Sequence, residues 1–187
     1  RTERADAAVA AAVAKTLEST ILLEMHPRTQ IALHLHILND AGSKLACCLN
    51  AASLALADAG VPTRDFLAAA TAGRVGDQIF LDLTKDEEAA ASRFTVSVLP
   101  RDSTLLLALL DGPPIDSDAF RDLLDRAIHA AKRAATDLAF LAREHAALAV
   151  HLRDATALVP PVAHDSPLIA DLLPSATRTP PRPPPPG

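Results

Sequence analysis

A long apolar stretch that follows a tight turn constrains the fold of this chain more than any other feature. Residues Asn39 to Gly60 read NDAGSKLACCLNAASLALADAG, where Asn, Asp and Gly are typical of a turn and the remainder is apolar on nearly every side. A helix of this kind is buried, so other elements must surround it. We expect Ser43 to be its N-cap, Lys44 its first residue and Gly60 its end.

The N-terminus of this helix is a candidate anion site. Its unpaired N–H groups and the positive end of its dipole favour a phosphate or a carboxylate. The same connection of strand, glycine turn and capped helix is also found in many α/β domains that bind nothing there. The motif alone leaves both interpretations open.

The segment before the turn, Thr29 to Leu38, has the alternation of a half-buried strand. One face would carry apolar residues and the other Gln30, His34 and His36. The two histidines share that face, which permits a metal pair, but no third ligand with suitable spacing accompanies them. A solvent-facing or interface pair is therefore the favoured interpretation.

The remaining pattern predicts an α+β fold. We expect a helix, the strand above, the buried helix, a largely antiparallel set of four strands and a long helix, whose part from Asp137 could be a separate or kinked piece. The expected bounds are Ala5 to Glu24 for the first helix, Asp65 to Thr71, Gln78 to Leu83, Phe94 to Leu99 and Thr104 to Leu110 for the strands, and Asp116 to His151 for the last helix.

Composition narrows the function classes. Of the 187 residues, five are Phe and none is Trp or Tyr, which disfavours an aromatic platform for stacking bases. A net charge of -5 argues against a general polyanion binder. Cys47 and Cys48 are adjacent in the apolar helix and suit buried thiols in a reducing compartment. Without a membrane-length apolar run or a signal peptide, we expect a soluble cytosolic or nuclear chain.

The end of the chain differs in composition from the rest. Ten of the 15 prolines fall within residues 160–187. We expect residues 154–187 to form a disordered or polyproline-II tail, more often a solvated spacer than a ligand for a proline-reading module. The expected organisation is then a helical lead-in over residues 1–12, a domain over residues 13–153 and this tail.

A second candidate site lies in the sequence LDLTKDEEA. Asp82 stands between Leu81 and Leu83, which favours an outward-facing strand carboxylate; the alternative is a metal-binding or acid/base group near the helix that follows Gly42. Residues 86–88 are acidic and suit the first turn of a short helix.

Taken together, HPRTQIALHLHILNDAGSKLACCLNAASLALADAGVPTRDF and the following LDL segment resemble the RNase PH family. The likeness is closest to the RNase PH-like ring subunits of the eukaryotic RNA exosome. It implies a ribosomal protein S5 domain 2-like fold, of which this sequence holds the C-terminal part. Active members of the family phosphorolyse RNA from its 3′ end and release nucleoside diphosphates.

The resemblance also assigns site residues. Gly42, Ser43 and Lys44 stand where the family has a Gly-Thr-Arg that grips phosphate, and Asp82 and Glu88 stand where it has two aspartates. Lysine replaces a planar bidentate donor with a point charge. Glutamate shifts its carboxylate by about one C–C bond, and a misplacement near 1 Å can cost about a hundredfold in rate.

These departures predict a non-catalytic structural subunit of the exosome ring, supporting 3′-to-5′ RNA processing and degradation, including rRNA maturation. Lys44, Arg28, Arg74 and Arg101 are candidates for RNA contact, with plain surface charge as the alternative for each. The partners implied are other RNase PH-like subunits in a hetero-hexameric ring, cap proteins, an associated nuclease and RNA, but neither membrane nor DNA. The implied location is the nucleus, nucleolus and cytoplasm.

Two alternatives remain at this point. One is an active phosphorolytic exoribonuclease, in which Ser43 and Lys44 hold phosphate and Asp82 acts through Mg²⁺ or as a general acid. The other is an unrelated α/β interaction module whose turn only imitates the motif. No resident metal or cofactor is expected, and Mg²⁺ and inorganic phosphate would be needed only by the active enzyme.

Overall fold

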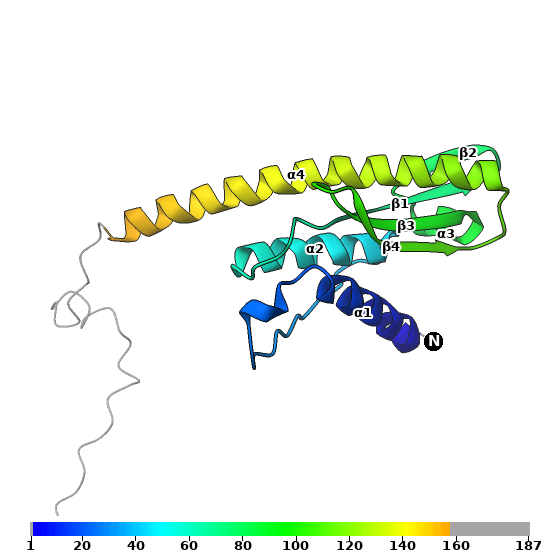
Figure 1. Ribbon diagram of the computed structural model, residues 1–187. Coiled ribbons are helices and arrows are strands. Elements are labelled where there is room, and N and C mark those ends of the chain that lie inside the picture. Colours follow the sequence, from blue (N-terminus) through cyan, green and yellow to red (C-terminus); the bar gives the residue numbers. More distant parts are fainter. Residues whose placement is uncertain (1, 158–187) are drawn as a thin grey trace, which may run out of the picture. The chain divides into compact units, whose positions relative to one another are not determined.

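The computed structural model describes residues 2–157, with side chains described for residues 4–151. The chain divides into two units, residues 1–146 and 147–187, and the first unit contains the sheet. Figure 1 shows the elements in order. They are α1 (Thr2–Glu18), η1 (Leu23–Met25), α2 (Lys44–Asp58), β1 (Ala68–Val75), β2 (Gln78–Leu81), α3 (Lys85–Ala90), β3 (Ser92–Leu99), β4 (Thr104–Asp111) and α4 (Ser117–Ala157). None of the helices in the described part is long and apolar enough to cross a membrane.

The four strands form one antiparallel sheet in the order β2-β1-β3-β4. The prediction of four largely antiparallel strands is therefore confirmed, although β1 begins later than expected. The Asp65 carboxylate accepts hydrogen bonds from the N–H groups of Phe66 and Arg101, each at 2.8 Å, and residues 64 and 65 form a bend before the strand. β1 pairs with β3 as well as with β2, so a strand distant in sequence lies at its side.

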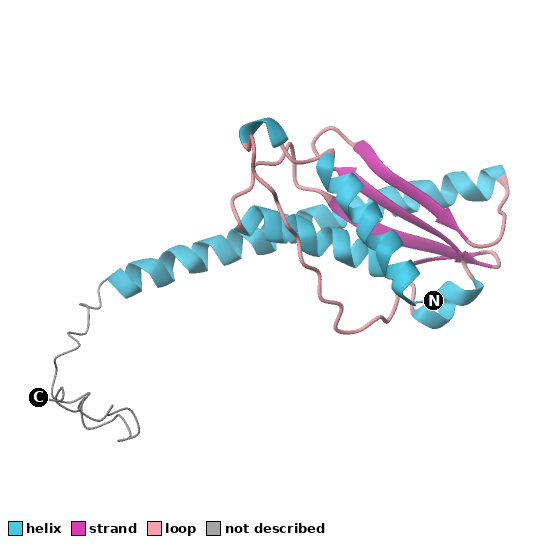
Figure 2. Ribbon diagram, turned by 90° about the horizontal axis from the view of Figure 1, so that it is seen from below, coloured by secondary structure: helices cyan, strands magenta, loops and turns pink. Residues whose placement is uncertain are grey.

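Helices cover both faces of the sheet (Figure 1). On one face, the fully buried Leu49 and Ala52 of α2 belong to a core that includes Val13 and Leu17 of α1. On the other face, Leu123, Ala127 and further small residues of α4 pack on the sheet. Figure 2, viewed from below, shows α1 and α2 with the long loops that join them. The prediction of a buried central helix is confirmed, since α2 is enclosed between α1 and the sheet.

Asn50 fixes α2 to the edge of β1. Its side-chain amide donates to the Ala69 carbonyl at 3.0 Å, and its amide oxygen accepts from the Ala69 N–H at 2.7 Å. One polar residue of an apolar helix thus provides hydrogen-bond partners for both the N–H and the carbonyl of Ala69.

The strand predicted over Thr29 to Leu38 is wrong. These residues form no strand, and residues 30–38 make no backbone hydrogen bond to another segment of the described chain. Leu33 and Leu35 still pack against the core, so the alternation correctly indicated which side of the segment is apolar. A strand also needs a partner backbone, and the described residues do not supply one.

The two long helices also differ from expectation. α1 crosses the expected boundary at residue 12 without a break, but it ends at Glu18, not Glu24. The hydroxyls of Ser19 and Thr20 donate to the Thr16 carbonyl at 2.7 and 3.1 Å, an alternative to helical bonding that is typical of these residues. α4 is continuous through Asp137 and extends past residue 154 to Ala157. The rest of the expected tail lies outside the described residues.

Candidate functional site

The turn before α2 is held against the segment that follows β2. Gly42 has φ +130°, and a Cβ there would lie 2.1 Å from the Leu83 carbonyl oxygen. The Lys85 N–H donates to the Ala41 carbonyl at 2.7 Å, one residue before the glycine. Only glycine permits both the backbone angle and this approach. The N-termini of α2 and α3 are brought together as a result.

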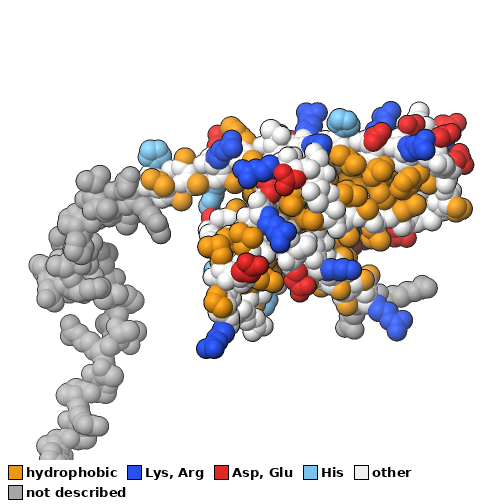
Figure 3. All heavy atoms as spheres, in the orientation of Figure 1, with side chains coloured by type: hydrophobic (Ala, Val, Ile, Leu, Met, Phe, Trp, Pro, Cys, Tyr) orange, Lys and Arg blue, Asp and Glu red, His pale blue; other side chains and the backbone are white. Residues whose placement is uncertain are grey.

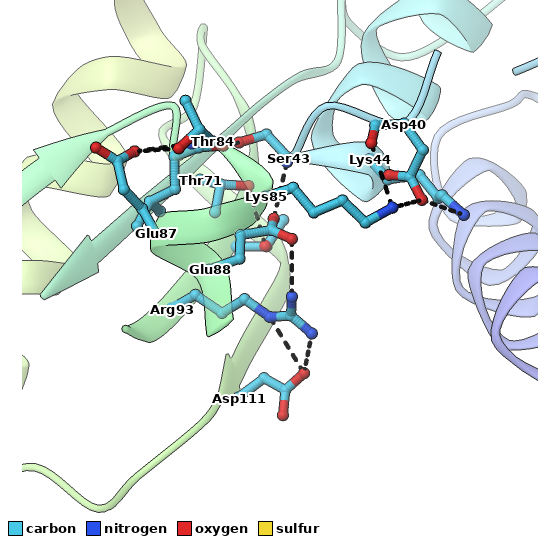
Figure 4. A network of polar contacts seen from close by, with 12 residues as sticks. Asp40, Ser43, Lys44, Thr71, Thr84, Lys85, Glu87, Glu88, Arg93 and Asp111 are labelled. Atoms are coloured by element: carbon cyan, nitrogen blue, oxygen red, sulfur yellow. Dashed lines mark hydrogen bonds and ion pairs between the residues drawn. The ribbon is translucent and has the colours of Figure 1, made fainter. Parts of the chain in front are cut away.

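The predicted side-chain cap of α2 is wrong, although the helix does begin at Lys44. Ser43 has the left-handed angles φ 49° and ψ 30°, whereas a capping residue has an extended backbone. Its hydroxyl donates to the Leu83 carbonyl at 3.5 Å and caps no N–H of the helix. The Ser43 N–H instead donates to Oε1 of Glu88 at 2.8 Å (Figure 4). A carboxylate of this chain therefore lies at the anion site that the sequence predicted.

Glu88 is held in place by its neighbours. Its second oxygen, Oε2, accepts from Nη1 of Arg93 at 3.1 Å, and the same guanidinium binds the Asp111 carboxylate. Asp111 raises the pKa of Arg93, and Arg93 in turn lowers the pKa of Asp111. Both partners thus remain charged over an extended pH range. The predicted acidic first turn is confirmed as that of α3, and Glu87 accepts the Thr84 N–H at 2.8 Å.

The ammonium of Lys44 is also occupied by carboxylates. It lies 2.9 Å from Oδ1 of Asp6 and 3.4 Å from Oδ2 of Asp40. Oδ2 of Asp40 also accepts a hydrogen bond from Nζ of Lys85 at 3.0 Å, and this bond is the largest cause of the lowered pKa of Asp40. The bond to Asp6 is the largest cause of the raised pKa of Lys44. Lys44 is therefore already paired where the family arginine would meet phosphate.

Five of these charged residues line one cavity of about 230 Å³, namely Asp40, Lys44, Lys85, Glu88 and Arg93, whereas Asp6 and Asp111 do not line it. Figure 4 shows their side chains converging between α2, α3 and β3. The network contains three cations and four carboxylates, so its formal charge is −1. Its members are Lys44, Lys85, Arg93, Asp6, Asp40, Glu88 and Asp111. Each of the three cations is paired with at least one carboxylate of the network, so an incoming phosphate meets no unpaired positive charge there.

The predicted strand position of Asp82 is wrong. β2 ends at Leu81, and Asp82 has φ 58° in the link to α3, with its N–H donating to the Thr71 carbonyl at 2.9 Å. Asp82 is exposed and does not line the cavity that holds Glu88. Of the two thiols expected to be buried, Cys48 is buried and Cys47 is exposed.

The predicted RNA-contacting arginines are not gathered at this cavity. Arg74 donates to Asp77 at 2.9 Å and to the Gly76 carbonyl at 2.7 Å, both in its own hairpin. Arg28 is exposed in the loop after η1, and the Arg101 N–H binds Asp65 in the turn before β1. The structure therefore unites Gly42, Ser43, Lys44 and Glu88 and leaves the arginines elsewhere.

The histidine pair is exposed. His34 and His36 lie in the unpaired segment before the turn. Among the described side chains, no group of three or more His, Cys, Asp or Glu residues is arranged to hold a metal ion. These observations match the favoured solvent-facing interpretation of the pair.

Several site residues were missed by sequence reasoning. Arg93 and Asp111 are direct cross-strand partners in the register of β3 and β4. Opposite charges at facing positions of a hairpin are a recognisable signal once the register is known. Lys85 and Asp6 reach the site from elements far apart in sequence, and no local pattern marks them.

Acid should weaken this network. The pKa values of Asp40 and Asp111 are lowered from 3.8, so the folded chain favours their charged forms. Their stabilisation is fully present above the pKa of the unfolded chain and is lost as the pH falls through the lowered values. We expect the free energy of unfolding, measured in urea from neutral pH to about pH 2.5, to decline below about pH 4.

The variant Asp111→Asn should show a shallower decline, by about 1 kcal/mol or less, because the pair is partly exposed. Asp77→Asn removes an exposed carboxylate outside the network and is the matched control. An identical acid profile in the Asp111→Asn and Asp77→Asn variants would contradict this assignment.

Comparison with known proteins agrees with the fold. Residues 1–62 match the description "3′ exoribonuclease family, domain 1", and residues 65–134 match "3′ exoribonuclease family, domain 2". The rice (Oryza sativa) Rrp46 structure resembles the chain with a TM-score of 0.65 and 26% identity, covering 70% of this chain and 62% of that one.

Sequence relatives are named exosome complex components. Human exosome complex component RRP41 is 37% identical over 146 residues, which is 78% of this chain and 57% of the relative. Exosome complex component ski6 of Schizosaccharomyces pombe is 48% identical over 88 residues, 47% of this chain and 36% of the relative. The chain thus spans about half the length of these relatives.

The comparisons name both Rrp46 and RRP41. The two family matches together cover most of the chain, in chain order, and the fold agrees with them. This excludes the unrelated interaction module. The chain belongs to the RNase PH family of 3′ exoribonucleases.

Proposed function

We propose that this chain is part of a non-catalytic structural subunit of the RNA exosome core ring. Relatives over most of its length are named exosome complex components. In this role it packs against other RNase PH-like subunits of a hetero-hexameric ring, beneath cap proteins and beside an associated nuclease. It supports 3′-to-5′ RNA processing and degradation, including rRNA maturation, in the nucleus, nucleolus and cytoplasm.

The observation that carries this proposal is the position of the Glu88 carboxylate. It accepts the Ser43 N–H at 2.8 Å, where an anion bound at the start of α2 would lie. A phosphate would have to displace this bond, and a hydrogen bond to a charged group contributes about 1.5 to 3 kcal/mol. It would also enter a cavity that already contains two carboxylates, those of Asp40 and Glu88.

The cation at the site supports the same conclusion. Lys44 is a point charge without the planar fork that matches phosphate oxygens. Asp6 and Asp40 both lie within ion-pair distance of it. A phosphate would therefore compete with two carboxylates for one ammonium group. The active enzyme, by contrast, requires that ammonium to hold the attacking phosphate.

An RNA cleavage assay tests the proposal directly. The purified chain, alone and within its ring, is incubated with 3′-labelled poly(A) RNA, Mg²⁺ and inorganic phosphate. We expect no phosphate-dependent release of labelled nucleoside diphosphate, and no change on substituting Asp82→Asn. Release that is present in the unmodified chain and in Asp77→Asn, but absent in Asp82→Asn, would establish the phosphorolytic enzyme instead.

Removal of Glu88 should open the anion site. In Glu88→Ala the Ser43 N–H loses its acceptor, and the formal charge of the network rises by one. We expect millimolar phosphate to raise the thermal midpoint of this variant above that in chloride of equal ionic strength, because a bound ligand stabilises the folded state. The unmodified chain should show a smaller response.

The matched control for this variant is Asp86→Ala, which removes a carboxylate from an exposed position of the same helix. The thermal midpoint of Asp86→Ala measures the general effect of phosphate on a folded protein, because this variant does not open the site. Equal responses of the Glu88→Ala and Asp86→Ala variants would show that Glu88 does not block the site.

A further inference from the structure

One peptide bond at the surface of this chain joins an aspartate to a glycine. β4 ends at Asp111, and Gly112 begins the link to α4. Of the six glycines in the sequence, only Gly112 follows an aspartate or an asparagine. Both residues are exposed, and the Asp111 side chain is 56% exposed. Figure 3 shows acidic side chains gathered at the end of the molecule where Figure 1 places the start of α4. Water therefore has access to this peptide bond.

The glycine makes this bond open to attack by its own nitrogen. A backbone nitrogen can attack the side-chain carboxyl of the aspartate before it, and a Cβ on the residue that carries the nitrogen hinders the approach. Gly112 has no Cβ, and its φ of +114° is one that other residues rarely adopt. The Gly112 N–H also donates a hydrogen bond to the Asp111 carboxylate. The attacking nitrogen and the carboxyl group are therefore already close together.

Arg93 holds the same carboxyl group in its charged form. Nε of Arg93 lies 3.2 Å from Oδ2 of Asp111, and Nη2 binds the same oxygen (Figure 4). The hydrogen bond from Arg93 is the largest cause of the lowered pKa of Asp111. The attack needs the neutral acid, because an ionised carboxylate is a poor electrophile and its oxygen a poor leaving group. Arg93 thus opposes the reaction that Gly112 permits.

We propose that the bond between Asp111 and Gly112 is a site of isoaspartate formation, and that the ion pair with Arg93 slows this reaction in the folded chain. The Gly112 nitrogen attacks Cγ of Asp111 and forms an N–Cγ bond. The proton of the nitrogen and the hydroxyl of the carboxyl group leave as water, which gives a cyclic succinimide. Water then adds to the main-chain carbonyl carbon of Asp111 and breaks its bond to nitrogen, so that the chain continues through Cγ.

The product would alter the charge network at the start of α2. An isoaspartyl residue adds a methylene to the main chain and leaves its carboxylate on Cα. That carboxylate no longer has the position that Asp111 takes opposite Arg93 in the register of β3 and β4. Arg93 then keeps only its bond to Glu88 within the network. The proposal is independent of the RNA-related function, since neither RNA nor another exosome subunit enters the reaction or its test.

The test variant is Arg93→Gln, incubated at neutral pH beside the unmodified chain. Mass spectrometry with electron-transfer fragmentation distinguishes the two isomers of each aspartate and follows isoaspartate at position 111 over time. We expect its rate of formation to rise about two- to fivefold, as for the loss of an exposed ion pair. The control is Arg74→Gln, which removes an arginine bound to Asp77 in another hairpin and should leave the rate at Asp111 unchanged. Equal rates at Asp111 in the two variants would overturn the role of Arg93.

The same measurement in concentrated urea removes the dependence on variant folding. Arg93 no longer holds Asp111 in the unfolded chain, so we expect the unmodified chain to form isoaspartate faster in urea than in buffer. The unmodified chain and both variants should react at one rate in urea. An unmodified chain that reacts as fast in buffer as in urea would contradict the proposal. Isoaspartate that accumulates at other aspartates but not at Asp111 would contradict it as well.

Discussion

The variant Gly42→Ala is expected to lose roughly 3 to 5 kcal/mol of its free energy of unfolding, measured in urea at neutral pH. Its Cβ would lie 2.1 Å from the Leu83 carbonyl oxygen, a backbone atom that no side-chain rotation can move. The angle φ +130° is in addition one that residues with a side chain rarely adopt. Relief requires the turn before α2 to leave α3, which separates Ser43 from Glu88.

Gly60 offers a matched control for this variant. It also has a positive φ, +68°, but a Cβ there would meet nothing within 4 Å. Gly60→Ala should therefore lose only the backbone term, about 1 to 2 kcal/mol. If the two variants lost equal free energy, the contact with Leu83 would not be the cause.

The second large effect is expected from Leu83→Ala. This side chain is 2% exposed and covers Gly73 of β1, while its carbonyl accepts the Ser43 hydroxyl. Truncation of a buried leucine leaves a cavity and usually costs about 2 to 5 kcal/mol. We expect a loss in this range in urea unfolding, together with a weaker Ser43 to Glu88 contact, seen as faster exchange of the Ser43 amide.

Leu81→Ala is the control, because it lies two residues earlier in the same segment and is 53% exposed. Exposed substitutions usually stay within about 0.5 kcal/mol. A loss in Leu81→Ala comparable to that of Leu83→Ala would mean that the whole segment, and not the buried side chain, fixes the turn.

The sequence predicted the elements whose signal is local. Short apolar runs between turns located four strands, and the apolar helix after Gly42 was found with its first residue. The strand predicted over Thr29 to Leu38 was wrong because alternation shows only which side of a segment is apolar, whereas a strand also requires a partner strand. α1 ends early where the hydroxyls of Ser19 and Thr20 bind the Thr16 carbonyl. Helix propensity alone does not predict this competing hydrogen bonding.

The site could be predicted only in part. Of the residues that the resemblance assigned, the structure brings Gly42, Ser43, Lys44 and Glu88 together but not Asp82. The motif could not show that Glu88 would bind the Ser43 N–H, because that contact depends on the left-handed backbone of Ser43 and on the close approach at Gly42. The pairing of Arg93 with Asp111 depends likewise on strand register.

The bond between Ser43 and Glu88 also bears on the order of folding. It joins residues 45 positions apart, whereas β3 and β4 are consecutive strands joined by a short turn. Closing a longer loop costs more conformational entropy, so contacts between distant residues form after local hairpins. We therefore expect the start of α2 to stay open to solvent during early folding, until Glu88 reaches the Ser43 N–H.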